Sequence, residues 1–153
     1  MVEHVPPAVV QFGSNYIVWT AGFAWIFAQL LKVILGAIRE RRFNFMWFVG
    51  TGGMPSAHAA GITALASSIG LYKGFNSDLF AVALFFAIIV LFDAQGVRRA
   101  SGKQAEALNK ILDDIYWKKK IQEERLIELL GHTPVEIFAG VAIGVLIALM
   151  CYR

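Results

Sequence analysis

The stretch Gly50–His58, which reads GTGGMPSAH, lies between two long apolar runs. It combines three glycines with two hydroxyls and an imidazole. Glycine-rich backbone can turn its N–H groups toward an anion. Pro55 favours a helix start, and Ser56 can cap that helix or bond a ligand at its positive end. An ordinary loop with an N-cap explains the stretch equally well by itself, so the rest of the chain has to decide.

The composition indicates a membrane protein. The chain has 153 residues, of which 58% are apolar, and its mean hydropathy is +0.60. Several apolar runs approach the roughly 20 residues that a helix needs to cross a bilayer. The start of the chain has no basic region before the first apolar run, so we expect no cleavable signal peptide. Cys151 is the only cysteine, which excludes an internal disulfide and a zinc-type cysteine cluster.

The apolar runs predict an all-α fold, a polytopic membrane helical bundle that forms one domain over residues 1–153. Its four spans are expected at about residues 9–38, 56–71, 79–93 and 134–152. The second run is rich in Ala, Gly and Ser, so its helix should lie at the centre of the bundle. Gly140 and Gly144 mark a close helix contact, either within the bundle or between protomers of a homodimer.

Two connecting segments have their own character. Residues 43–49 are short, aromatic and apolar, which suggests an interfacial or re-entrant piece. Residues 105–130 show helical apolar spacing between many charges, which predicts an amphipathic helix at the membrane surface or over the bundle.

The basic residues predict the orientation. With four spans both termini lie on one side, and of the fourteen Lys and Arg residues only Lys73 and Arg153 fall there. The positive-inside rule makes the opposite side cytoplasmic and places both termini outside, in what we expect to be a bacterial cytoplasmic membrane. The Gly-rich stretch, Asp93 and His132 then gather at a cationic cytoplasmic face, which suits an anionic headgroup.

The string around His132 reads GHTPVE and has two interpretations. Thr133 and Glu136 fit a capping box, with Pro134 at the first helical position. Glu136 can also accept a hydrogen bond from the imidazole of His132, fix its tautomer and leave the other nitrogen as a nucleophile or base. Both interpretations can hold together.

Lys32 and Arg39 are seven residues apart and therefore share one face of the first span. Two cations there can hold a phosphate, although anchoring of the helix at the membrane surface explains them as well.

Taken in order, Lys32-x6-Arg39, Pro55-Ser56-Ala57-His58 and His132-x3-Glu136 resemble the three motifs of the phosphatidic acid phosphatase type 2 superfamily, which includes the vanadium haloperoxidases. The strings DAQGVRR at residues 93–99 and GHTP at residues 131–134 resemble a small divergent branch of it. The resemblance runs from about Lys32 to the last span.

This resemblance implies hydrolysis of a phosphate ester through a phosphohistidine. His132 would attack phosphorus, Glu136 would orient it, and His58 would protonate the leaving oxygen. Lys32, Arg39 and Ser56 would bind the phosphoryl oxygens. Six residues separate Arg125 from His132 where the family pattern has five, so the remaining cation comes from Arg125 or from Arg98, Arg99 or Lys103.

The expected function is therefore a membrane lipid phosphate phosphatase, acting on a phosphomonoester or diphosphate headgroup. The expected partners are membrane lipids, including the phosphorylated headgroup, and not nucleic acid. The resemblance implies no metal and no other cofactor. The alternative is a non-catalytic protein of the same fold that binds an anionic lipid or phosphate.

Overall fold

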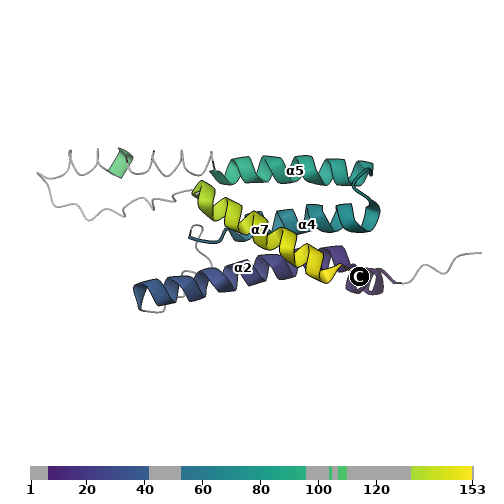
Figure 1. The fold of residues 1–153 in the computed structure, drawn as a ribbon, viewed down its shortest axis with the longest axis horizontal. Helices are drawn as coiled ribbons and strands as arrows, with labels where there is room; N and C mark the ends of the chain where they lie inside the picture. Colours follow the sequence, from purple (N-terminus) through teal and green to yellow (C-terminus); the bar gives the residue numbers. More distant parts are fainter. Residues whose placement is uncertain (1–6, 42–52, 96–103, 105–106, 110–131, 153) are drawn as a thin grey trace, which may run out of the picture.

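The computed structural model describes residues 7–41, 53–95, 104, 107–109 and 132–152. Within this part of the chain every regular element is a helix, which confirms the all-α prediction. The long helices lie side by side in one bundle (Figure 1). The helices are α1 Ala8–Gly13, α2 Tyr16–Glu40, α4 Ala57–Lys73, α5 Asp78–Gln95 and α7 Pro134–Cys151.

We predicted one helix over residues 9–38, but the first apolar run forms two helices, α1 and α2. The break falls at Ser14 and Asn15, whose side chains compete with a continuous helical ladder. The Ser14 hydroxyl donates to the carbonyl of Val10 at 3.0 Å, and the Asn15 side chain accepts the N–H of Val18 at 3.3 Å as the N-cap of α2. The polar pair therefore ends α1 and starts α2.

The helices alternate in direction, so the bundle has two chemically different ends (Figure 1). At the end called here the site end, α2 and α5 finish while α4 and α7 begin. At the other end, called the terminus end, α2 and α5 begin while α4 and α7 finish. The polar stretches around Ser56 and His132 thus meet at the site end, as the prediction of four alternating helices requires.

The helix α4 lies at the centre, as its small residues predicted. It packs against α2, α5 and α7, and it separates the backbones of α2 and α5. Its buried positions are mainly alanines, serine and glycine, which let the neighbouring backbones approach closely.

The glycine pair of α7 makes its close contact inside the bundle. A β-carbon on Gly140 would collide with the carbonyl oxygen of Ser56, and one on Gly144 would lie 2.9 Å from the backbone nitrogen of Ala64. Both glycines are buried against α4. Of the two alternatives for this face, the structure shows the contact within the bundle, because α4 covers both glycines. A homodimer stays a prediction.

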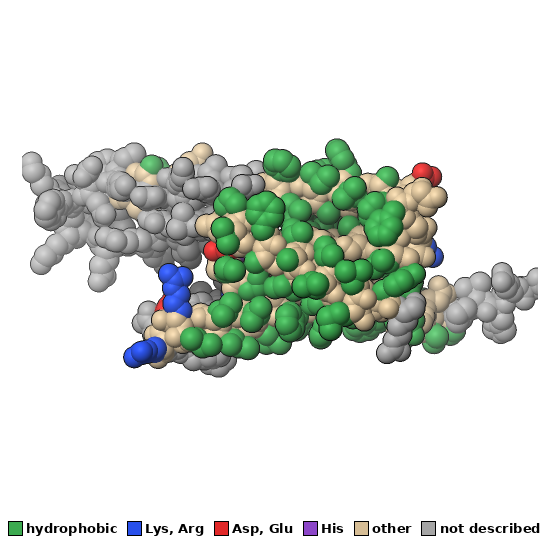
Figure 2. Space-filling view, in the orientation of Figure 1, with side chains coloured by type: hydrophobic (Ala, Val, Ile, Leu, Met, Phe, Trp, Pro, Cys, Tyr) green, Lys and Arg blue, Asp and Glu red, His purple; other side chains and the backbone are tan. Residues whose placement is uncertain are grey.

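The packing places small residues inside and large apolar residues outside. Ala24, Ala28 and Ala60 are fully buried, whereas Phe92 and Phe138 are 71% and 73% exposed. On the face that Figure 2 shows, hydrophobic side chains cover the middle of the bundle and charged groups lie at its two ends. A lipid bilayer suits this distribution, because large apolar side chains then face hydrocarbon.

Among the described helices, α2 and α7 are long and apolar enough to cross a membrane, by length and composition. Four spans therefore stay a prediction, since α4 has only 17 residues. Gln104 and residues 107–109 are helical, but most of the predicted amphipathic segment and the whole of residues 43–49 lie outside the described residues.

Gly140→Ala should destabilise the bundle, because the new methyl group meets the carbonyl of Ser56 and the β-carbon of Ala59. Overpacking of this kind costs about 1–3 kcal/mol. Gly22→Ala is the matched control, because nothing lies within 4 Å of a β-carbon there. Thermal unfolding in detergent should show a lower midpoint for Gly140→Ala only. An equal midpoint in both variants would contradict the packing.

Candidate functional site

The side chains of His132 and Glu136 form a hydrogen-bonded pair at the start of α7. The Nδ1 atom of His132 lies 3.0 Å from Oε2 of Glu136. The same carboxylate oxygen accepts the backbone N–H of Thr133 at 3.0 Å, while the Thr133 hydroxyl accepts the N–H of Glu136. The two interpretations of the GHTPVE string therefore hold together, because one carboxylate both closes the capping box and orients the histidine.

This geometry determines which ring nitrogen of His132 is available for chemistry. An ionised carboxylate only accepts hydrogen bonds, so Nδ1 carries the proton. The lone pair of the neutral ring then resides on Nε2. His132 is buried, with 2% of its surface exposed, which strengthens the bond to Glu136.

Two backbone hydrogen bonds attach this pair to the rest of the bundle. The N–H of His132 donates to the carbonyl of Ala94 at 3.2 Å, near the end of α5. The N–H of Ser56 donates to the carbonyl of Glu136 at 3.0 Å, just before α4. Three helices therefore fix the position of His132.

Ser56 serves as the N-cap of α4. Its hydroxyl oxygen accepts the N–H of Ala59 at 3.3 Å, and its surface is fully buried. Pro55 immediately precedes this cap, so the helix start and the capping role of Ser56 are as the sequence predicted. The predicted phosphate ligand Ser56 thus already has a structural role.

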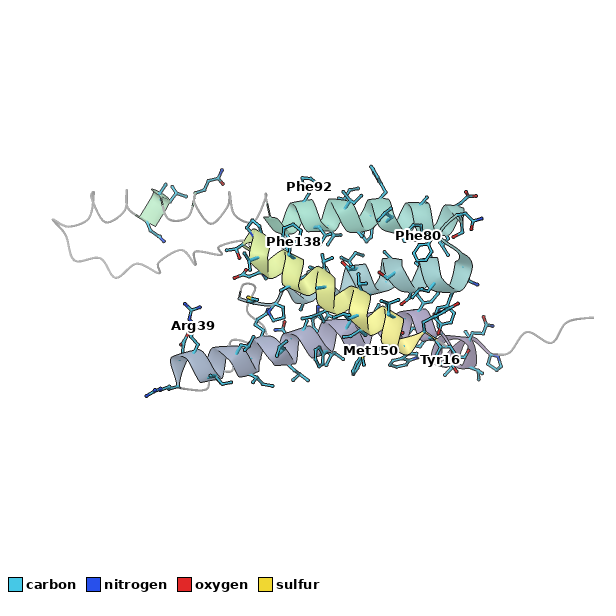
Figure 3. The ribbon with its side chains drawn as sticks, in the orientation of Figure 1. Tyr16, Arg39, Phe80, Phe92, Phe138 and Met150 are labelled. Carbon is cyan, nitrogen blue, oxygen red and sulfur yellow. The ribbon has the colours of Figure 1, made fainter. Side chains whose placement is uncertain are left out.

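Lys32 and Arg39 occupy the same face of α2, as predicted, but in different environments. Lys32 is 8% exposed, and its stem lies against Gly53, where a β-carbon would be 3.4 Å from its Cγ. Its ammonium interacts electrostatically with Glu136. Arg39 is exposed and lies roughly 10 Å farther along the helix. Its side chain extends from α2 on the side where α7 begins (Figure 3).

His58 lies in the first turn of α4, at the site end, and is exposed. The helix α7 covers the side of α4 that carries Ala59 and Ala60. At about 100° per residue, His58 projects from another side of that turn. The structure thus groups Lys32, Ser56, His132 and Glu136, with His58 and Arg39 at the rim.

The backbone adds positive charge to this group. Both α4 and α7 begin here, and the amino end of a helix carries a partial positive charge. Together with the Lys32 and Arg39 side chains, the two amino ends form an environment that favours an anion.

Four predicted cations of the site lie outside the described residues, so their role stays a prediction: Arg98, Arg99, Lys103 and Arg125. The sequence did not identify the carbonyl of Ala94 as a support for His132, although it lies within the DAQGVRR string. No group of three or more His, Cys, Asp or Glu side chains within the described part of the chain is placed to hold a metal.

A family model described as the "Divergent PAP2 family" matches residues 13–147. The chain belongs to this family. The matched region contains every site residue discussed above, both described and predicted. The recognition that rested on Lys32, Arg39, Ser56, His58, His132 and Glu136 is therefore confirmed.

A curated relative supports the same assignment to the divergent PAP2 family. The "Uncharacterized membrane protein YuiD" of Bacillus subtilis (strain 168) is 39% identical over 148 residues, which cover 90% of this chain and 94% of the relative. No solved structure matches the chain.

Thr133→Ala and Glu136→Ala should separate the two roles of the carboxylate. Losing a cap costs about 1 kcal/mol, so both variants should be less stable. Thr133→Ala should retain the single Nδ1–H tautomer of His132, whereas Glu136→Ala should give a mixture of tautomers. Nitrogen NMR of labelled histidine tests this. An unchanged His132 spectrum in Glu136→Ala would contradict the pairing.

Proposed function

We propose that this chain is a membrane lipid phosphate phosphatase that acts through a phosphohistidine at His132. The observation that carries the proposal is the buried His132–Glu136 pair, held at the cationic end of the bundle. Membership of the divergent PAP2 family supports it. The substrate is a phosphomonoester or diphosphate headgroup, such as a phosphatidate, a phosphatidylglycerophosphate or a prenyl phosphate or diphosphate.

The phosphoryl group binds where the two helix amino ends and the cations meet. The stem of Lys32 lies near Gly53 and its ammonium is attracted to Glu136, while Arg39 receives the headgroup at the rim. Arg98, Arg99, Lys103 or Arg125 adds a further cation. Phosphoryl transfer depends mainly on such positioning and charge stabilisation. The backbone N–H groups beside Ser56 donate to the phosphoryl oxygens, and the Ser56 hydroxyl can still donate its proton while its oxygen caps α4.

In the first step the lone pair on Nε2 of His132 attacks phosphorus. The bond from phosphorus to the alkoxide or phosphate leaving group breaks, and His58 donates a proton to the departing oxygen. The phosphorylated ring becomes cationic while Nδ1 stays bonded to Glu136. The carboxylate therefore stabilises the charge that develops during the attack.

In the second step water completes the hydrolysis. His58, now neutral, accepts a proton from the water as its oxygen attacks phosphorus. The N–P bond breaks, which returns the electron pair to Nε2 and releases inorganic phosphate. His58 takes this role from the rim of the site, because it is exposed in the first turn of α4, at the same end of the bundle as His132.

The proposed setting is a bacterial cytoplasmic membrane crossed by α2, α4, α5 and α7. The apolar exterior supports four spans, and the name of the B. subtilis relative describes a membrane protein. The excess of Lys and Arg at the site end supports a cytoplasmic site with both termini outside. A homodimer would have to use a surface other than the Gly140–Gly144 face.

A second candidate function is binding of an anionic lipid or phosphate without turnover. Two observations favour it. Ser56 is fully buried as the cap of α4, and His58 projects from a side of α4 that does not face α7. Such a protein would keep the cationic end of the bundle but would not transfer a phosphoryl group.

Release of inorganic phosphate from a panel of lipid phosphates separates the two functions. Purified protein in detergent should release phosphate with EDTA present, and His132→Ala should reduce the rate at least about 10³-fold, as expected for loss of a nucleophile. His58→Ala should also slow release, by about 10²–10⁴-fold, as expected for loss of a general acid. Binding of vanadate without release in the wild type would favour the second function.

The third histidine, His4, provides the matched control for these variants. It lies outside the three family motifs, so His4→Ala should release phosphate at the wild-type rate. All three variants should keep the wild-type unfolding midpoint within a few degrees. Full activity of His132→Ala would contradict the proposed nucleophile, and collapse of its fold would instead indicate a structural role for this histidine.

Cysteine labelling tests the orientation. In a Cys151→Ala background, Asn76→Cys at the terminus end should react with an impermeant reagent on intact cells, and Glu40→Cys at the site end should not. Both positions are exposed. Asn76 is a better choice than Gly74, whose φ of +91° disfavours any side chain. The reverse labelling pattern would place the site outside the cell.

A further inference from the structure

A cavity of about 330 Å³ lies at the terminus end, away from the proposed catalytic group. It forms beside the break between α1 and α2, where α4 also finishes. Its wall takes residues from α1, from the break at Ser14 and Asn15 and from the first turn of α2. The polar side chains in its wall are Gln11, Ser14, Asn15, Tyr16, Tyr72 and Lys73.

The lining of the cavity matches an anion. Lys73 is its only charged residue, no carboxylate lines it, and no ion pair joins Lys73 to a carboxylate in the described ranges. Asn15 uses its side-chain oxygen to cap α2, so its NH₂ group is left to donate. The hydroxyls of Ser14 and Tyr72 already donate to backbone carbonyls. The wall therefore offers an anion the Lys73 ammonium, the Asn15 NH₂ group and the Tyr16 hydroxyl.

The location of Lys73 is itself informative. Twelve of the fourteen Lys and Arg residues lie in the parts of the sequence that meet or connect at the site end. Lys73 is one of the two exceptions. A basic residue on the outer side opposes the charge bias that orients a membrane protein. An anion in the adjacent cavity would offset this unfavourable charge.

Aromatic side chains place the cavity at the level of lipid headgroups. Tyr16, Trp19 and Tyr152 are exposed at this end, as in the interfacial belt of membrane proteins. Trp19 is fixed by a hydrogen bond from its indole N–H to the carbonyl of Gly13 at 3.1 Å and by an edge contact with Phe12. Figure 3 shows Tyr16 at the end of the bundle opposite Arg39.

We propose that this cavity binds a phosphate-ester anion, either the headgroup phosphate of a lipid in the adjacent leaflet or a free phosphate. Lys73 supplies the charge, and Asn15 and Tyr16 donate hydrogen bonds. The length of α4, 17 residues or roughly 25 Å, separates the cavity from the His132–Glu136 pair. The two anion sites therefore face opposite membrane surfaces, and this one does not depend on catalysis.

Native mass spectrometry of the detergent-purified full chain with phosphatidylglycerol tests the proposal. Lys73→Met should lower affinity for one bound lipid about tenfold, the loss expected for one charge-assisted hydrogen bond. Lys73→Arg, the matched control, should bind as the wild type does. Both variants keep the catalytic end unchanged, so lipid bound there contributes equally to the two measured affinities. Lys73 is exposed, so neither variant should disturb the fold.

Two further arms identify the ligand. Diacylglycerol with the same acyl chains lacks the phosphate and should show no dependence on Lys73. Displacement of the Lys73-dependent lipid by inorganic phosphate would assign the site to the phosphate group alone, and resistance to displacement would assign it to a whole lipid. Equal binding of phosphatidylglycerol by Lys73→Met and Lys73→Arg would overturn the proposal. So would a loss of diacylglycerol binding in Lys73→Met that is as large as the loss of phosphatidylglycerol binding.

Discussion

The close contact between α7 and the first turns of α4 is the constraint on which the rest of the structure depends. Because Gly140 has no side chain, α7 approaches the carbonyl of Ser56, and the N–H of Ser56 can reach the carbonyl of Glu136 at 3.0 Å. The amino ends of two helices thereby lie together. The same contact places the His132–Glu136 pair beside Lys32, which α2 supplies from the opposite direction.

Much of this arrangement could be predicted from the sequence because membrane packing leaves simple patterns. The small residues of α4 predicted its central place, and His132-x3-Glu136 predicted a pair that the structure shows at 3.0 Å. The break at Ser14 and Asn15 was missed, because an apolar run does not show that two polar side chains cap their own backbone. Spacing along the chain could not reveal the side of α4 from which His58 projects, or the support that Ala94 gives His132, because both depend on the packing of different helices.

The bundle separates its chemistry along its length. Alanine and glycine allow the helices to pack closely in the middle, while the large apolar residues face outward. Charge is thereby confined to the ends, where the site end carries the proposed catalytic group and the terminus end carries Lys73 and its cavity. Under the two proposals, each end recognises an anionic group at its own membrane surface, whereas an amphiphile's tail remains in the hydrocarbon.

The central claim is that a phosphoryl group is transferred to Nε2 of His132. The most direct measurement is rapid quenching of the protein with a lipid phosphate labelled in its phosphoryl group, followed by digestion and mass spectrometry at alkaline pH. The account predicts a phosphoryl group on the peptide that contains His132, stable in alkali, lost in acid and absent from His132→Ala. Turnover of the labelled lipid with the phosphoryl group on another residue, or on no residue at any quench time, would contradict the account.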